Sequence, residues 1–247
     1  PRVAMTGCAV ILVAISAYAA IKKPVVLTRN FYGIIKVQDR QEKYRGAVHQ
    51  LRVMSHGTTI HGTQIREAGL ETAMTTYYSS SGPLGNIFSL YKPQNIAVMG
   101  LGAGTINCYG TPQNAFTFFE INQAVVDMAK AHFSYLEKCK ARRPARIILG
   151  DARLEFARQG DKEFDLIILD VFSSDMIPTH LLTREAMQLY MEHLAPGGLM
   201  VFHTSNRYFN FEEVIAATAG PLGLENRYAF DSAAKDPHAS SSKWMAL

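Results

Sequence analysis

The stretch Ile96-Ala-Val-Met-Gly-Leu-Gly-Ala-Gly104 combines a short apolar run with three glycines at alternate positions. The next apolar run, Phe116-Thr-Phe-Phe-Glu120, ends in a carboxylate. Glycines let the backbone turn sharply and approach a ligand closely, and a carboxylate can accept hydrogen bonds from ribose hydroxyls. This order of strand, glycine turn, helix, strand and acid is typical of the first half of a nucleotide-binding βαβ unit.

Strands and helices alternate along the rest of the chain. Beyond the two runs above, strands are predicted at residues 146–149, 164–169 and 199–203, helices at 122–133, 153–159 and 183–193, and a turn at 196–198. This alternation predicts a mostly parallel, doubly wound α/β sheet. Ahead of it, residues 31–64 have the short apolar runs and turn residues of a small antiparallel meander, and residues 65–85 have the composition of a loop.

The composition suits a globular protein of one α/β domain and a small addition, because 48% of the 247 residues are hydrophobic and 19% are charged. The net charge of +4 is mild, and the basic residues between 138 and 146 fit a solvated helix end better than a nucleic-acid site. Cys8, Cys108 and Cys139 are odd in number and lack the spacing of metal ligands. They indicate neither a disulfide framework nor a zinc site, and they favour a reducing compartment.

Residues 5–21 form a largely apolar run of 17 residues without charges, followed by Lys22, Lys23 and Arg29. This length is at the lower limit for a helix that spans a bilayer, and a basic flank favours the cytoplasmic side. We therefore predict a transmembrane helix over residues 1–23. The alternatives are a signal peptide, with Ala17-Tyr-Ala19 as its cleavage site, and a buried helix. Because the chain begins with proline and ends in a strand-like run, we expect it to be cut from a longer protein.

Glycines or carboxylates follow four of the predicted strands: the glycine loop, Glu120, Gly150-Asp151 and Asp170. Ligands of open α/β sheets bind beyond the carboxyl ends of the strands, so these residues predict a cofactor site. The loop lacks the GxGxxG spacing of dinucleotide sites and the lysine of triphosphate sites. A ribose-binding acid and a second acid for an adenine amino group favour S-adenosylmethionine or a derivative. Carboxylates and tyrosine faces would stabilise its sulfonium.

Six segments carry a more specific pattern: His56-Gly-Thr-Thr-Ile-His61-Gly-Thr-Gln64, Tyr77-Tyr78, Gly100-Leu-Gly-Ala-Gly104, Glu120-Ile-Asn, Gly150-Asp-Ala and Asp170-Val-Phe-Ser-Ser-Asp175-Met-Ile-Pro178. In this succession the chain resembles the spermidine synthase (polyamine aminopropyltransferase) family. It is most similar to the branch in which such a domain follows membrane-spanning helices. The resemblance covers about residues 28–247.

The resemblance implies a class I S-adenosylmethionine-dependent methyltransferase-like (Rossmann-like) fold with a doubly wound sheet. It implies a β-rich subdomain over residues 28–85 and a nucleoside-binding catalytic domain over residues 86–247. Residues 1–23 would be the last helix of a preceding membrane region. We accordingly expect membrane attachment with the catalytic domain in the cytoplasm, a small-molecule amine and no nucleic acid as partner, and a homodimer as the assembly to test.

The family's reaction would transfer an aminopropyl group from decarboxylated S-adenosylmethionine to a polyamine acceptor such as putrescine, without a metal. The cofactor-binding residues implied by position are Gly100, Gly102, Gly104, Glu120, Asp151, Ala152, Gln64 and Tyr78. Of these, Glu120 would hold the ribose and Asp151 the adenine. Asp170 and Asp175 correspond to the acidic catalytic pair, and Asp175 best matches the residue that deprotonates and orients the attacking amine.

Three departures from the family pattern bear on the amine. Ala103 stands at an aspartate position of the glycine loop, Ser79 stands at the position of an acid that grips the amine, and Val171-Phe172 lengthens the segment between the two aspartates. Two other functions stay open on the same scaffold: an S-adenosylmethionine-dependent methyltransferase and a non-catalytic ligand-sensing domain of a membrane protein. His56 and His61 are interpreted as structural, because no third metal ligand stands near them in the sequence.

Overall fold

The computed structural model describes residues 24–44, 47–139, 141–160, 163–171, 178–206, 209–233, 236 and 238–247. The transmembrane helix predicted over residues 1–23 and the predicted catalytic residue Asp175 lie outside these ranges. Within the described part of the chain, no helix has the length and apolar character needed to cross a membrane.

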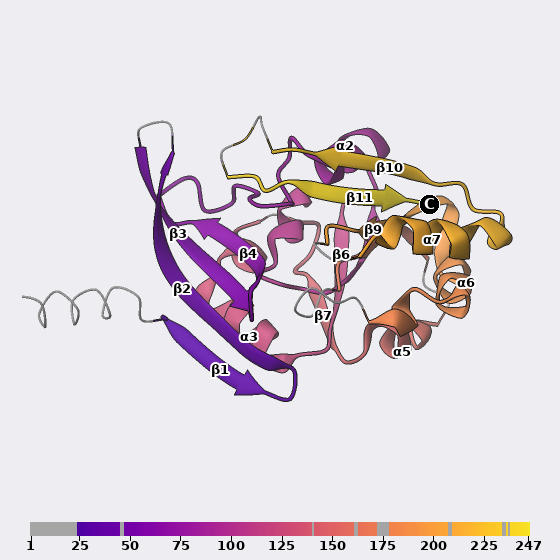
Figure 1. Ribbon diagram of the computed structural model, residues 1–247, viewed down its shortest axis with the longest axis horizontal. Helices are drawn as coiled ribbons and strands as arrows, with labels where there is room; N and C mark the ends of the chain where they lie inside the picture. Colours follow the sequence, from indigo (N-terminus) through magenta and orange to yellow (C-terminus); the bar gives the residue numbers. More distant parts are fainter. Residues whose placement is uncertain are drawn as a thin grey trace, which may run out of the picture.

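A four-stranded antiparallel sheet forms the amino-terminal part of the described chain (Figure 1). Its strands, in spatial order, are β1 (Val26–Asn30), β2 (Gly33–Tyr44), β3 (Ala47–His56) and β4 (Thr59–Ile65). The predicted meander is confirmed, and it begins earlier than expected because β1 was not recognised. Two residues join β3 to β4, and the first of them, Gly57, has a φ of 58° that favours glycine.

A second sheet has seven strands in the order β10-β11-β9-β8-β5-β6-β7. They are β5 (Asn95–Met99), β6 (Ala115–Glu120), β7 (Arg146–Leu149), β8 (Phe164–Leu169), β9 (Leu194–His203), β10 (Arg227–Asp231) and β11 (Ser242–Ala246). Strands β5 to β9 pair in parallel, whereas β11 runs antiparallel to both of its neighbours, so the predicted mostly parallel sheet is confirmed. The chain order reverses at β5, which has β6 on one side and β8 on the other. Open α/β sheets bind ligands at such a switch point.

Helices cover both faces of the large sheet. One hydrophobic cluster includes α2 (Pro83–Tyr91), α3 (Gln123–His132) and α4 (Tyr135–Lys138), and a second includes α5 (Ala152–Ala157), α6 (Arg184–Glu192) and α7 (Phe211–Ala219). In β5, Ile96 and Val98 belong to the first cluster and Ala97 and Met99 to the second. Side chains alternate between the two faces of a strand, so a strand covered on both faces requires a continuous apolar run. Figure 1 shows α3 beside β2, with α5, α6 and α7 on the side away from the small sheet.

Local signals placed the starts of α3, α5 and α6 to within one residue, whereas α2 and α7 were not predicted. Thr183 caps α6 as predicted, because its side chain accepts the N–H of Ala186, and Asn122 caps α3 in the same way. Two expectations were wrong in detail. The helix expected after the glycine loop is a five-residue 3₁₀ segment, η1 (Thr105–Tyr109), and the turn expected at residues 196–198 lies inside β9. Two further 3₁₀ segments are η2 (Thr179–Leu181) and η3 (Gly220–Leu222).

The prediction about the cysteines is corrected by a disulfide between Cys108 and Cys139. It joins η1 to the end of α4, with a Cα–Cα distance of 4.8 Å and a sequence separation of 31. An odd number of cysteines does not prevent two of them from pairing. Their proximity results from the packing of α4 against η1, which spacing along the chain does not reveal.

Candidate active site

The glycine loop that follows β5 lies in close contact with two neighbouring segments. Gly100 has a φ of 94°, and a Cβ at this position would overlap the carbonyl oxygen of Asp170 at the end of β8. Gly102 has a φ of 53°, and a Cβ there would overlap the carbonyl oxygen of His61 in β4. Glycine is therefore required at both positions, by conformation and by space.

Glu120, the last residue of β6, supports this loop. Its carboxylate accepts the backbone N–H of Leu101 at 3.0 Å and that of Asn122 at 2.9 Å. Burial raises the pKa of Glu120, and the two backbone N–H groups act in the opposite direction. Hydrogen bonds thus join the loop to the acid predicted to bind a nucleoside.

A cavity of about 250 Å³ opens at the carboxyl ends of β5, β6 and β8. Six of the residues that sequence analysis selected line it: Gly100, Gly102, Glu120, Asp151, Ala152 and Asp170. Asp151 is also the N-cap of α5, where its carboxylate accepts the N–H of Leu154 at 3.0 Å and lies 2.9 Å from Nε2 of His180. This cavity, called the nucleoside cavity after the ligand that sequence analysis predicts for it, therefore has carboxylates on two of its sides and the glycine backbone on another.

A second cavity of about 360 Å³ adjoins the first. The two cavities share His61, Gly102 and Asp170. The larger one is further lined by Tyr77, Tyr78, His203, Ser205 and Lys243. A molecule in the larger cavity would meet a molecule in the nucleoside cavity beside Asp170.

The carboxylate of Asp170 is held by two partners. One oxygen lies 2.8 Å from Nδ1 of His203, and the other accepts the hydroxyl hydrogen of Tyr78. Burial alone would raise the pKa of Asp170, but the charge and hydrogen bond of His203 and the hydrogen bond of Tyr78 lower it below its ordinary value. Burial and the charge of Asp170 raise the pKa of Tyr78, so this pair is a carboxylate beside a neutral phenol.

Comparison with known proteins assigns the family. Residues 87–220, more than half of the chain, match the spermine/spermidine synthase domain. The chain belongs to the spermine/spermidine synthase family. As a family member, it carries the matched segment from α2 to the start of η3, which includes the glycine loop, Glu120, Asp151 and Asp170.

The individual relatives have low sequence identity with this chain. A polyamine aminopropyltransferase of Vibrio vulnificus is 32% identical over 127 residues, which are 47% of this chain and 40% of that protein. The alignment thus spans less than half of the relative. A probable spermidine synthase from Corynebacterium glutamicum has the same fold, with a TM-score of 0.65 and 18% identity over 91% of this chain and 80% of that one. A spermidine synthase in complex with the transition state analogue AdoDATO has a TM-score of 0.61 and 14% identity over 92% of this chain and 72% of that one.

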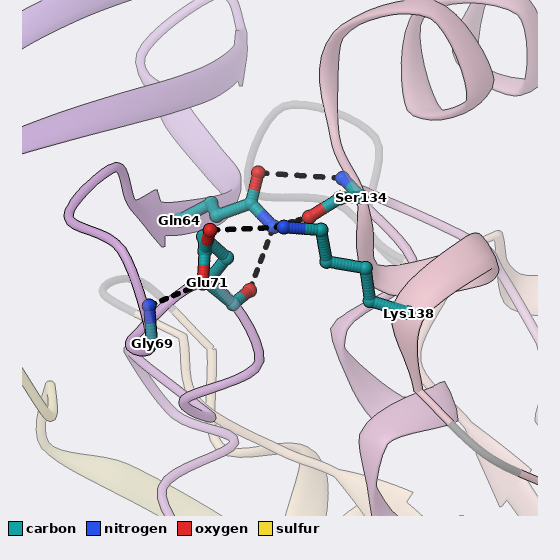
Figure 2. Close-up of polar contacts among 5 residues, drawn as sticks. All are labelled: Gln64, Gly69, Glu71, Ser134 and Lys138. Atoms are coloured by element: carbon teal, nitrogen blue, oxygen red, sulfur yellow. Dashed lines mark hydrogen bonds and ion pairs between the residues drawn. The ribbon is translucent and has the colours of Figure 1, made fainter.

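Two residues expected at the cofactor of this spermidine synthase homologue line neither cavity. Gly104 packs near the side chain of Leu136. The side-chain amide of Gln64 donates to the carbonyl of Glu71 and to the hydroxyl of Ser134, both at 2.8 Å, as Figure 2 shows. Glu71 in turn forms an ion pair with Lys138 at 2.9 Å. In this position Gln64 connects β4 to the start of α4.

Sequence analysis missed three residues at the cavities. His61, interpreted as structural, lies where the cavities meet, and its buried Nε2 has no hydrogen-bond partner among the described residues. His203 and Ser205 line the larger cavity at the end of β9. The signal for His203 was available, because it ends a parallel strand just as Glu120 does. Among the residues that the structure describes, no cluster of side chains is arranged to hold a metal ion.

Proposed function

We propose that this chain is an aminopropyltransferase that moves an aminopropyl group from decarboxylated S-adenosylmethionine to an amine. The observation that carries the proposal is the pair of adjoining cavities, which share Gly102 and Asp170. The nucleoside would occupy the smaller cavity and the acceptor amine the larger one. The family assignment supports this reaction, and so does the similar fold of a spermidine synthase that binds a transition state analogue.

In the nucleoside cavity, Glu120 would accept the ribose hydroxyls and Asp151 the adenine amino group, with Ala152 beside it. Each carboxylate oxygen has a second acceptor direction, so the existing backbone contacts of Glu120 leave capacity for a hydroxyl. The carboxylate of Asp170 and the faces of Tyr77 and Tyr78 would stabilise the sulfonium near the boundary of the cavities.

The reaction is an in-line displacement at the carbon beside the sulfonium. The attacking amine must be neutral, although an alkylamine has a pKa of about 10 by analogy with lysine. A proton acceptor within reach of the amine and correct positioning of the two substrates supply the acceleration. Asp175, implied by the family resemblance as the residue that deprotonates the amine, remains a proposal, because it lies outside the described residues.

The products of the reaction distinguish the candidate functions. The purified protein is incubated with decarboxylated or intact S-adenosylmethionine and a panel of amines, and both nucleoside products are quantified. Release of methylthioadenosine supports aminopropyl transfer, and release of S-adenosylhomocysteine indicates methyl transfer instead. Tight binding without either product indicates a sensing domain.

Binding of methylthioadenosine tests the site itself. Glu120→Gln replaces one acceptor oxygen by an NH₂ group that faces a backbone N–H, so we expect at least about tenfold weaker binding by calorimetry. Glu225→Gln is the control, because its side chain is 87% exposed and lies on neither cavity. Equal affinity of the two variants would contradict the proposed ribose site.

We also propose that residues 1–23 attach the protein to a membrane, with the catalytic domain in the cytoplasm. The apolar run and its basic flank support this proposal. Expression with and without residues 1–23, followed by membrane fractionation, tests it. Recovery of both forms in the same soluble fraction would contradict it. Sedimentation of the truncated form tests whether it is a homodimer.

A further inference from the structure

Three side chains at the larger cavity form a continuous hydrogen-bonded chain. The carboxylate of Asp170 lies 2.8 Å from Nδ1 of His203, and Nε2 of the same ring lies 2.8 Å from Oγ of Ser205. All three residues line this cavity. They come from the ends of two neighbouring parallel strands, β8 and β9.

The hydrogen bonds assign a direction to this chain. The hydroxyl oxygen of Ser205 accepts the backbone N–H of Lys243 at 2.8 Å, so its own hydrogen is available for Nε2 of His203. Nδ1 then carries the ring hydrogen and donates it to the carboxylate of Asp170. In this assignment His203 is neutral. Its Nε2 accepts the hydroxyl hydrogen of Ser205, and Ser205 connects this nitrogen to the cavity.

The surroundings of His203 also suit the protonated ring. Its side chain is 3% exposed. The ring is stacked with Trp244 at 4.5 Å between centroids and lies 4.8 Å from the ring of Tyr77. Two aromatic faces and a carboxylate on Nδ1 are therefore in place beside the ring to interact with a proton that arrives through Ser205.

Asp170 is already occupied by its partners. Both of its carboxylate oxygens have hydrogen-bond partners within the protein, Tyr78 and His203. It is therefore arranged to position His203 and to stabilise its protonated form. Ser205 can offer its hydroxyl oxygen to a substrate in the larger cavity, whereas both oxygens of Asp170 already have partners.

We propose that Ser205 and His203 form a relay that takes the proton of the attacking amine in place of Asp175, whose proposed role is then to orient the amine. This inference rests on the proposed aminopropyl transfer. The ammonium of the acceptor gives one proton to Oγ of Ser205, and the hydroxyl hydrogen of Ser205 moves to Nε2 of His203. The lone pair of the resulting amine forms the new C–N bond, and the electrons of the breaking C–S bond neutralise the sulfonium. The product is a secondary ammonium and methylthioadenosine, and His203 later returns its proton to solvent.

Other titratable groups lie around the relay. From the described elements packed near His203 these are Asp170 after β8, Tyr77 and Tyr78 before α2, His61 in β4, Lys243 in β11 and Glu212 in α7. Glu212 lies 3.9 Å from Nζ of Lys243 and accepts the hydroxyl of Thr204. Of these groups, Asp170 is the one hydrogen-bonded to the ring.

The test uses the variants His203→Gln, Ser205→Ala and their combination in the full chain. General-base catalysis contributes about 100-fold or more, so each single change should lower kcat for methylthioadenosine release by about that factor. Because the two residues act in one relay, removing the second should add little. The kcat of the double variant should therefore lie within about threefold of the kcat of His203→Gln. His132→Gln and Ser89→Ala, which lie on neither cavity, should keep the wild-type rate.

The pH profile separates a relay from a structural role. In His203→Gln, kcat should keep rising toward the pKa of the free amine, about 10, and the shape of its pH profile should differ from that of the wild type. Methylthioadenosine should bind both variants with affinities within about threefold of the wild type. The relay is wrong if the losses in kcat of the two single variants multiply in the double variant. It is also wrong if the pH profile of His203→Gln has the same shape as that of the wild type.

A measurement without turnover separates this inference from the proposed function. Nitrogen-15 spectra of the histidine rings should show His203 with its hydrogen on Nδ1, a signal lost in His203→Gln and shifted in Asp170→Asn and Ser205→Ala. The opposite tautomer overturns the relay even if methylthioadenosine is released. If the wild type releases none with any amine, the proposed transfer fails, and the relay fails with it as an amine-deprotonating device.

Discussion

The side chains between the two cavities have charges set by burial and by hydrogen bonds. Asp170 is largely buried yet remains ionised because His203 and Tyr78 both support its charge. His61, which lies on the same shared wall, lacks such support at its buried Nε2. Burial lowers the pKa of His61 to about 4, although the charge of Asp170 opposes this effect. A neutral ring therefore faces the place where a sulfonium would lie.

The pKa of His61 predicts a loss of stability in mild acid. Its value is about 4 in the folded state and 6.5 for the free side chain, so the unfolded chain binds more protons between these limits. The stability that depends on neutral His61 is fully present above pH 6.5 and is lost as the pH falls toward 4. At pH 5 this amounts to about 2 kcal/mol of unfolding free energy.

Urea unfolding at pH 7.5 and 5.0 measures this effect. The wild type should lose about 2 kcal/mol more than His61→Gln between the two pH values. Ser89→Ala, which changes an exposed residue without a titratable group, should lose as much as the wild type. The assignment is wrong if His61→Gln and the wild type change by the same amount.

At the scale of elements, the site depends on how the glycine loop is held. The loop leads into the five-residue segment η1, which is too short to be stable by itself. Glu120 holds the beginning of the loop through the backbone N–H of Leu101. The Cys108–Cys139 disulfide attaches η1 to the end of α4. The nucleoside cavity is therefore fixed by contacts with β6 and α4 more than by helix formation.

The disulfide should contribute measurably to the stability of the protein. Its partners are 31 residues apart, and the chain-entropy relation for a loop of this size gives about 3–4 kcal/mol. We expect a lower thermal midpoint for the Cys108→Ala/Cys139→Ala variant and for the wild type treated with reductant. Reductant should leave the double variant unchanged. Equal midpoints for the oxidised and reduced wild type would contradict the prediction.

At the scale of the whole molecule, the two sheets share one hydrophobic cluster. Ile35 and Met54 of the small sheet belong to the same cluster as Val98 of β5 and Trp244 of β11. Because the small sheet also supplies His61 to both cavities, its docking completes the site. We expect the described sheets to unfold together, as packed elements of one core do.

Ile35→Ala tests this cooperation. Ile35 is 1% exposed, and loss of its buried side chain should cost about 2–5 kcal/mol. Trp244 is the single tryptophan of the chain and lies in the other sheet, so its fluorescence reports the effect at a distance. Leu27→Ala in β1, at a side chain 55% exposed, should change stability by less than about 0.5 kcal/mol. An unchanged Trp244 transition in Ile35→Ala would mean that the sheets unfold separately.

Local patterns were sufficient for the parallel strands of the large sheet, although β10 was not predicted. A continuous apolar run identified β8 at its observed bounds, and Thr183 marked the start of α6. The rule that ligands bind at strand ends also placed Glu120, Asp151 and Asp170 on one cavity, because parallel strands bring their carboxyl ends to one edge. These inferences need only neighbouring residues and the handedness of the chain.

Contacts between distant segments decided the rest. The partners of Asp170, the position of Gln64 away from the cavities and the pairing of Cys108 with Cys139 all join residues more than 30 positions apart. The sequence by itself determined the α/β class, the glycine loop and the acids at the strand ends, because strand periodicity and turn chemistry act locally. Only the tertiary structure decided which side chains meet at the shared wall, because hydrogen bonds and desolvation depend on what packing places nearby.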